Sequence, residues 1–365
     1  MGGVVSGGDN MTGHMIGQVG SMGEMLLSYL QKHWPGGGLL DIRNFTRITS
    51  GWENEVYSFQ LVNQSDDTSS DLVLRVYPGN DAKAKSRWEF GIIDLLSTTG
   101  FPVPDVYLLE VEASPFLRPF LIMEKISGPS LRELISNATP HNATGLINVF
   151  CQLFVDLHSW NWREHEATLA SISKAGRISD LKVELRTWQR LAGLGWESTF
   201  DWLLTQHAKL VDQPPCLTHG DFHPDNIIMR EDSIPYVIDW GGARLQDFRL
   251  DLAWTILLVG TYDRWEMGEM ILEQYESILG KNVADIHYFY AVAALRRLLS
   301  VYISVTSGAA ELGMRQGAET MMVRDLPHLW RVYQVWQSNT GMDVPVIQDF
   351  LDELDPKQPS AGNME

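Results

Sequence analysis

Cysteine is scarce in this chain of 365 residues, which contains only Cys151 and Cys216. Two cysteines in apolar surroundings cannot build the disulfide framework of a small secreted domain. The first lysine or arginine is Lys32, so the amino terminus lacks the positive region of a signal peptide. We therefore expect a reducing, cytoplasmic environment.

Positive charge is also sparse. The chain has 28 Lys and Arg against 46 Asp and Glu, which gives a net charge of −18. Such a surface repels nucleic acid and anionic membranes, and we expect neither as a partner. No run in the sequence approaches the roughly eighteen apolar residues of a membrane span. A hydrophobic content of 44% indicates a globular protein, and the chain length favours two lobes over one core.

The most informative segment runs from His219 to Asn226 and is followed by Asp239-Trp240-Gly241. An Asp-x-x-x-x-Asn sequence with a downstream Asp-x-Gly has the spacing that phosphoryl transfer from ATP uses. Asp221 would accept a hydrogen bond from the attacking hydroxyl, and the oxygens of Asn226 and Asp239 would coordinate magnesium. The sequence therefore predicts a catalytic Asp221, a metal site at Asn226 and Asp239, and ATP and Mg²⁺ as cofactors.

Two other interpretations of the same segment are open. Asp and Asn beside Pro favour ordinary turns, for reasons of local hydrogen bonding. His219, Asp221, His223 and Asp225 are also ligand types that a metal hydrolase would use. A turn alone would not need the second aspartate after a strand, and we expect structural roles for both histidines.

A small β-rich region precedes this segment, with strands expected over residues 45–48, 56–61 and 72–77. Gly51 and Asn54 lie in the first connection, where glycine would let backbone amides approach a nucleotide phosphate, although a plain turn is the simpler alternative. Arg75 interrupts an apolar strand and needs a partner if it is buried. We expect that partner to be Glu89, on a helix over residues 82–97, and we expect the paired Arg75 to bind the nucleotide phosphates. The alternative is that Glu89 is exposed to solvent.

Strands expected over residues 106–109 and 120–124 would complete a five-stranded sheet. The following residues, up to Gly128, form the natural crossing between lobes. Adenine would hydrogen-bond backbone groups around Glu124 and Ile126 there. Helical periodicity dominates from Leu131 onward, with the main helices expected over residues 146–158, 180–191, 200–211, 251–259, 265–279, 288–303 and 318–336.

With these residues laid out, the chain resembles the aminoglycoside phosphotransferase and choline kinase-like family of small-molecule kinases. The most specific similarity is Leu217 to Asn226 together with Val237 to Trp240. The resemblance implies an α+β, protein-kinase-like bilobal fold, with a five-stranded antiparallel N-lobe carrying one main helix and a larger helical C-lobe. It also implies that Asp251 braces the catalytic loop. Residues 246–249 replace the Gly-Asp-Pro often seen before that position.

The implied domain plan has four parts. A disordered tail over residues 1–23 precedes a nucleotide-binding lobe over 24–124. The catalytic and substrate lobe covers 125–354, and a second disordered tail covers 355–365.

Our leading interpretation is an enzyme that transfers the γ-phosphate of ATP to a hydroxyl of a small molecule, such as an aminoglycoside-like compound, an amino alcohol or a sugar. The alternative is a nucleotide-binding pseudokinase with a regulatory or scaffold role. Net charge favours a cationic acceptor over other acceptors. Arg296 and Arg297 would either bind an anionic acceptor or form salt bridges within the helical lobe, and we expect the second.

Overall fold

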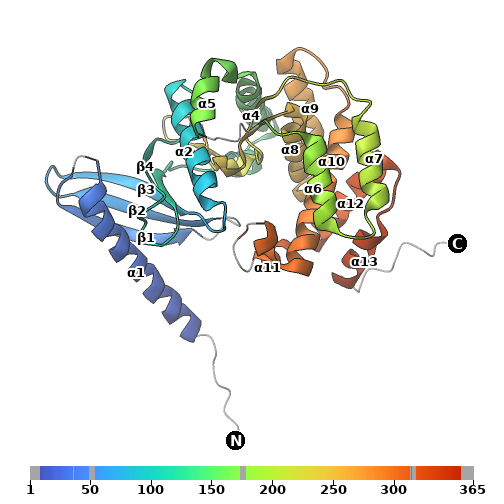
Figure 1. Ribbon diagram of the computed structural model, residues 1–365. Helices are drawn as coiled ribbons and strands as arrows, with labels where there is room; N and C mark the ends of the chain where they lie inside the picture. The colour runs from blue at the N-terminus through green and yellow to red at the C-terminus, as the bar shows by residue number, and fades with distance from the viewer. Residues whose placement is uncertain are drawn as a thin grey trace, which may run out of the picture. The chain divides into compact units, whose positions relative to one another are not determined.

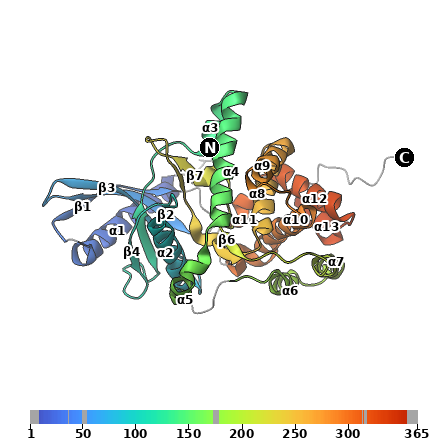
Figure 2. The same ribbon diagram turned by 90° about the horizontal axis from the view of Figure 1, so that it is seen from above.

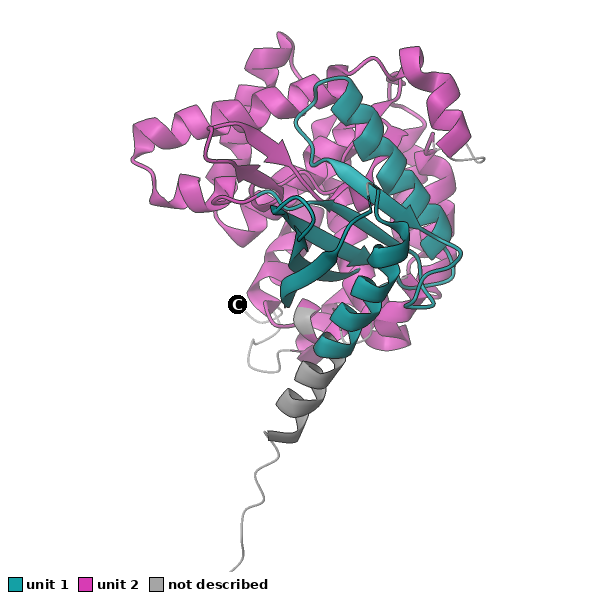
Figure 3. Cartoon of the chain, turned by 90° about the vertical axis from the view of Figure 1, so that its left-hand side faces the viewer, with its two compact units in different colours: residues 1–126, 313–315 teal, residues 127–312, 316–365 magenta. Residues whose placement is uncertain are grey.

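The computed structural model describes residues 9–35, 37–48, 54–172, 178–312, 314 and 318–354. The chain divides into two compact units, residues 1–126 with 313–315 and residues 127–312 with 316–365 (Figure 3). Gly51 and the tail predicted over 355–365 lie outside the described residues. The two units are treated separately below.

Unit 1 is built on a five-stranded sheet in the order β1-β2-β3-β5-β4, in which every neighbouring pair is antiparallel (Figure 1). This confirms the predicted sheet. The strand expected over residues 72–77 begins earlier than predicted, because residues 68–71 also pair with β2. The strands are β1 (Leu40–Ile48), β2 (Glu55–Asn63), β3 (Thr68–Val76), β4 (Val106–Glu110) and β5 (Phe120–Glu124).

One face of this sheet packs on α1 (Asp9–His33). Side chains alternate between the two faces of a strand, and Tyr57, Phe59 and Leu61 of β2 join Leu26 and Leu30 of α1 in one buried cluster. The helix begins well before residue 24, so part of the stretch that we expected as a disordered tail is helical. Apolar residues recur there at helical spacing, as Met11, Met15, Ile16 and Val19.

Unit 2 is mainly helical. The long helix α10 packs against α8 and α12, α8 packs against α9, and α9 packs against α4 (Figures 1 and 2). The helices are α3 (Leu131–Asn137), α4 (Pro140–Ser159), α5 (Glu166–Ile172), α6 (Leu181–Ala192), α7 (Glu197–His207), α8 (Phe248–Tyr262), α9 (Trp265–Leu279), α10 (Ile286–Ile303), α11 (Ala318–Met322), α12 (Leu326–Thr340) and α13 (Pro345–Leu354).

Two short antiparallel strand pairs interrupt the helices of unit 2. Strand β6 (Cys216–Thr218) pairs with β9 (Arg244–Gln246), and β7 (Ile227–Met229) pairs with β8 (Pro235–Val237). These four strands flank the segment that carries the sequence motif. Their function in the fold is to position its loops.

The single helix expected over residues 318–336 is wrong, because the chain forms α11 and α12 there. Proline lacks a backbone N–H and is tolerated in the first turn of a helix but not in its interior. Pro327 stands in that first turn, and the Asp325 side chain caps α12 by accepting a hydrogen bond from the His328 amide.

Among the described residues, one helical stretch, Ile286–Leu312, is long and apolar enough to cross a membrane by length and composition alone. The stretch is not one continuous apolar run, since Arg296 and Arg297 interrupt it. Within the fold, 72% of its most apolar window is buried. That burial is typical of a core helix, and α10 occupies the core of unit 2.

Candidate active site

The strand pairs of unit 2 bring the two halves of the motif together. The segment 219–226 connects β6 to β7, and Asp239 follows β8. Because β7 and β8 pair with each other, Asn226 and Ile238 flank the same end of the hairpin, where the Ile238 amide donates to the Asn226 carbonyl over 2.9 Å. Asn226 and Asp239 therefore stand at one end of one hairpin.

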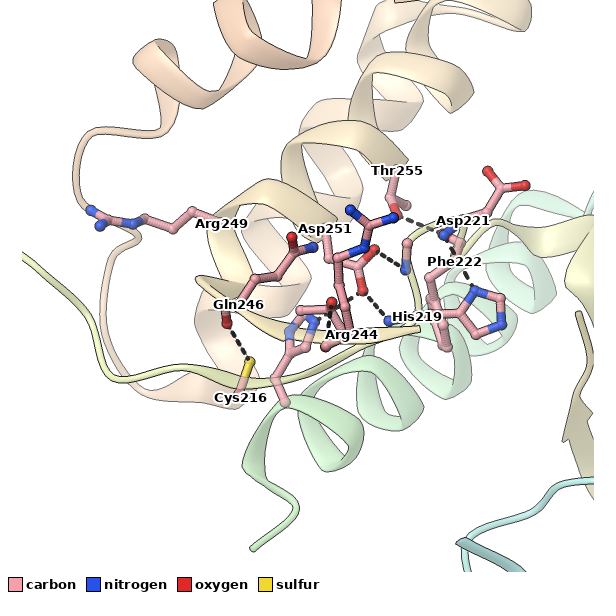
Figure 4. A network of polar contacts seen from close by, with 12 residues as sticks. Cys216, His219, Asp221, Phe222, Arg244, Gln246, Arg249, Asp251 and Thr255 are labelled. Carbon is pink, nitrogen blue, oxygen red and sulfur yellow. Dashed lines mark hydrogen bonds and ion pairs between the residues drawn. The ribbon is translucent and has the colours of Figure 1, made fainter. Parts of the chain in front are cut away.

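Through Asp251, helix α8 holds the backbone of residues 219–226, which are called the catalytic segment here after the function proposed below. Its carboxylate accepts hydrogen bonds from the amides of His219, at 2.7 Å, and Gly220, at 2.8 Å (Figure 4). Asp251 is buried, so the two N–H groups supply the polar contacts that a buried carboxylate requires. One turn further along α8, the Thr255 hydroxyl donates to the Phe222 carbonyl over 2.6 Å. These contacts agree with the brace that the family resemblance implied.

His219 has a structural role. Its ring Nε2 donates to the Ile238 carbonyl at 3.0 Å, and its Nδ1 accepts a 3.3 Å hydrogen bond from the Asp221 amide. Burial lowers the pKa of His219, so the ring is neutral and both nitrogens are engaged by backbone. Within the part of the chain that the structure describes, no three His, Cys, Asp or Glu side chains gather as a metal site.

Asp221 combines a fixed backbone with an accessible carboxyl group. Its side chain is 43% exposed and points away from Asp251 (Figure 4). The partial burial of the carboxyl opposes its ionisation, but hydrogen bonds from His223 and from the Trp254 indole, together with the charge of His223, lower the pKa of the Asp221 carboxyl. The Trp254 Nε1 to Asp221 Oδ1 distance is 2.9 Å. Asp221 is thus an ionised acceptor near neutral pH.

His223 lies between two carboxylates. Its Nε2 is 3.4 Å from Asp221 Oδ2, and its Nδ1 is 3.4 Å from Asp225 Oδ2. Burial opposes the imidazolium, yet Asp221 and Asp225 raise the pKa of His223 to about 9. Arg132 of α3 pairs with Asp225 and with Asp263 at the end of α8. The raised pKa favours the imidazolium form of His223, which stabilises the negative charge of Asp221.

Asn226 and Asp239 fit a magnesium site by the chemistry of their donor groups. The Asn226 amide nitrogen donates to the Asp221 carbonyl over 3.0 Å, which leaves its oxygen for another partner. The Asp239 carboxylate is exposed, and its backbone has a left-handed conformation with φ 67°. Non-glycine residues rarely adopt this conformation, and Asp and Asn are the ones that tolerate it best. Two hard oxygen donors at one hairpin end suit a hard cation.

In unit 1, the structure confirms the pairing of Arg75 with Glu89. The Arg75 side chain lies on the sheet face opposite the α1 cluster, toward α2 (Ala82–Thr98), and its Nη1 bonds to Glu89 Oε1. The Tyr77 hydroxyl donates to Glu89 Oε2 over 2.8 Å. Tyr77 stands two residues after Arg75 and therefore shares its face. Glu89 is fully buried, so the alternative of a solvated Glu89 is wrong.

The other residues predicted to bind the nucleotide are in unit 1. The Glu124 amide donates to the Asp105 carbonyl, and the Lys125 amide donates to the Asp71 carbonyl. Ile126 has no backbone hydrogen bond among the described residues. Asn54 is half-buried directly before β2.

Sequence reasoning missed three residues that support the catalytic segment: Trp254, Thr255 and Arg132. The available signal was the spacing of Asp251, Trp254 and Thr255, because residues three and four apart share one face of a helix. Arg132 gave no such signal, since it is far from its partners in sequence.

The unusual residues 246–249 lead from the end of β9 into the first turn of α8. The Asp247 side chain accepts a hydrogen bond from the Arg249 amide at the start of that helix, and the buried Arg249 guanidinium donates back to Asp247 and to the Val211 carbonyl. These residues therefore anchor the start of α8.

Comparison with solved structures identifies the fold. The chain is similar to a Ralstonia eutropha structure assigned as an aminoglycoside phosphotransferase, with a TM-score of 0.61, 18% identity, and coverage of 88% of this chain and 98% of that one. It is also similar to a choline kinase from Streptococcus pneumoniae, with a TM-score of 0.56, 16% identity, and coverage of 87% and 99%. The protein thus has the kinase-like fold of these enzymes, as the sequence predicted.

The sequence model of the phosphotransferase enzyme family matches residues 44–287. This range includes the catalytic segment, Asp239 and Asp251. The chain belongs to this family.

Among curated proteins, the chain is 27% identical over 232 residues to acyl-CoA dehydrogenase family member 11 of Rattus norvegicus, covering 59% of this chain and 28% of that protein. It is 30% identical over 224 residues to family member 10 of Mus musculus, covering 57% and 20%. The chain thus spans less than a third of the length of either relative, and the dehydrogenase activity in their names is not assigned to it.

The Gly220 backbone makes one prediction about the site. Gly220 has φ +85°, and a Cβ there would lie 2.5 Å from the Gly242 carbonyl oxygen. Gly280 has φ +73° with open space around it. We expect Gly220→Ala to lose at least about 2 kcal/mol of unfolding free energy, from backbone strain and steric overlap together. Gly280→Ala should lose about 1 kcal/mol from strain alone. Urea unfolding measures both, and equal losses would contradict the account.

Proposed function

We propose that this protein is an ATP- and magnesium-dependent phosphotransferase that transfers the γ-phosphate to a hydroxyl of a small molecule. The observation that carries the proposal is the accessible, ionised Asp221 carboxyl on a backbone held by Asp251. Family membership supports phosphoryl transfer as the reaction class. Structures with the same fold contain AMP-PNP with hygromycin B, and GDP with kanamycin, so nucleotide and small-molecule acceptor both have precedent on this fold.

In this mechanism Asp221 orients the acceptor and receives its proton. The acceptor hydroxyl donates to the Asp221 carboxylate, and its oxygen forms a bond to the γ-phosphorus. The bond from that phosphorus to the bridging oxygen of ADP breaks, and ADP leaves with the electron pair. The proton passes to Asp221 and then to water. The positive His223 keeps Asp221 ionised until that transfer.

The remaining residues bind the nucleotide and the cation. We assign Arg75, held by Glu89, to the nucleotide phosphates, and the backbone near Glu124 and Ile126 to the adenine. Gly51 and Asn54 remain the proposed phosphate loop. Asn226 and Asp239 would hold Mg²⁺, which supplies neutralisation of phosphate charge when bound.

Replacing Asp221 by Asn tests the assignment of the base. The amide cannot accept the proton, so phosphate transfer should fall by about 100- to 10,000-fold. Binding of MgATP should persist, and a saturating ligand at about a hundredfold over its Kd should still add about 2.7 kcal/mol to stability. The control is Asp232→Asn, because Asp232 pairs with Arg230 in the turn between β7 and β8. Unchanged transfer in Asp221→Asn would remove Asp221 from this role.

The same pair of assays separates the enzyme from the pseudokinase alternative. Stabilisation by MgATP without phosphate transfer to any acceptor of a broad panel would favour a nucleotide-binding scaffold.

Asp239→Asn tests the cation site. Asparagine tolerates the left-handed backbone, so the melting temperature should stay unchanged. Losing a charged oxygen ligand should raise the Mg²⁺ concentration for half-maximal transfer by about tenfold or more. The measurement is a magnesium titration of phosphate transfer at fixed ATP. An unaltered titration midpoint would place the cation elsewhere.

A further inference from the structure

Arg296 lies one side chain away from the proposed catalytic base. It projects from α10, is half-buried, and places its guanidinium carbon 4.1 Å from the centroid of the Trp254 ring. The same indole donates its N–H to Asp221 Oδ1 at 2.9 Å. A cation therefore lies against the side chain that orients the Asp221 carboxyl.

The two neighbouring arginines, Arg297 and Arg244, donate hydrogen bonds to other groups of the protein. Arg297 donates to the Tyr262 hydroxyl at 2.9 Å and to His328 Nε2 at 3.2 Å. Arg244 donates to Glu184 at 3.1 Å and to the Gly242 carbonyl at 3.3 Å. Both use their donors inside unit 2.

Arg296 differs from these two. Across the described residues, its only direct partner is the Trp254 ring, with no hydrogen bond and no carboxylate within ion-pair distance. The salt bridge that we expected from the sequence is therefore not formed by Arg296 in the described structure. The donors of its guanidinium remain available to a ligand.

The surroundings of Arg296 favour an anionic ligand. Burial, and then the nearby charge of Arg244, lower the pKa of Arg296, whereas the charges of Asp221, Glu184 and Asp251 raise it to a smaller extent. Among the described residues these carboxylates do not form an ion pair with Arg296, so an anionic ligand would supply the direct partner that the guanidinium lacks. Arginine stays protonated in proteins, and its planar fork matches a carboxylate or a phosphate through two parallel hydrogen bonds. The net charge of −18 is spread over the whole chain and acts weakly against such a short-range contact.

We propose that Arg296 binds a carboxylate or phosphate group of the acceptor, so that the acceptor is a small anionic alcohol. This inference rests on the proposed phosphotransferase function and names its substrate class. The acceptor spans the Trp254 edge, with its hydroxyl at Asp221 and its anionic group at Arg296. It replaces the cationic acceptor that net charge alone favoured.

A binding experiment tests the site without any turnover. Calorimetry on the full chain would compare four probes that share one carbon frame: glycerate, glycerol 3-phosphate, glycerol and 3-amino-1,2-propanediol. We expect the two anionic probes to bind more tightly than the neutral and cationic ones, and their order distinguishes carboxylate from phosphate recognition. Binding of neither anionic probe in preference to glycerol would overturn the proposal.

Three variants assign that preference to Arg296. Arg296→Met should weaken anionic probes by about 10- to 100-fold and leave glycerol unchanged, because charge-assisted bonds are lost. Arg296→Lys should recover part of the loss, since it keeps the charge without the fork. Arg163→Met is the matched control, because Arg163 also stacks on an indole, that of Trp162, at 5.0 Å. Equal loss in Arg163→Met and Arg296→Met would contradict a specific site.

Kinetics separates substrate binding from support of Trp254. If Arg296 binds the acceptor, Arg296→Met should raise KM for anionic acceptors and leave KM for neutral acceptors unchanged. If Arg296 only positions Trp254, kcat falls equally for all acceptors, and the inference is overturned. If the protein phosphorylates neutral or cationic alcohols, and Arg296→Met does not change the rate, the inference is overturned but the proposed function stands. Arg296-dependent anion binding without any transfer would keep the site and refute the proposed function.

Discussion

The site depends on one buried carboxylate that accepts two backbone amides. Asp251 binds the His219 and Gly220 N–H groups and thereby fixes the chain just before Asp221. A buried carboxylate is costly unless its oxygens are hydrogen-bonded, so the loop and the helix stabilise each other. Thr255, on the same face of α8, extends the contact to Phe222. Rigid support of this kind keeps a catalytic side chain in a productive position.

Charge is balanced by local pairs throughout the site, despite the acidic composition of the chain. His223 offsets Asp221 and Asp225, and Arg132 offsets Asp225 from the other side. Unit 1 uses the same principle, since the buried Glu89 receives Arg75 and the Tyr77 hydroxyl. A buried charge persists only when it is paired and hydrogen-bonded. Among the described residues, Arg296 departs from this pattern because it contacts only the Trp254 ring, and that is why it points to a ligand.

Local patterns were enough to predict the five-stranded sheet and the Arg75–Glu89 pair, because period-two alternation and the spacing between a strand and the next helix are encoded within short windows. They failed where a distant contact or a single breaker decides. Pro327 splits a helix that periodicity alone extends. The contact of Arg296 with Trp254 joins two helices that lie far apart in sequence. Such contacts become visible only in the fold.

Amide hydrogen exchange in Asp251→Ala tests the central claim most directly, when followed together with phosphate transfer. The exchange rates of the His219 and Gly220 amides should rise by at least about tenfold, because each amide loses a charged hydrogen-bond acceptor. Amides of α12 should keep theirs, and phosphate transfer should fall in the same variant. Full protection of the His219 and Gly220 amides in Asp251→Ala would contradict the account, because the loop would then be held by something other than this carboxylate.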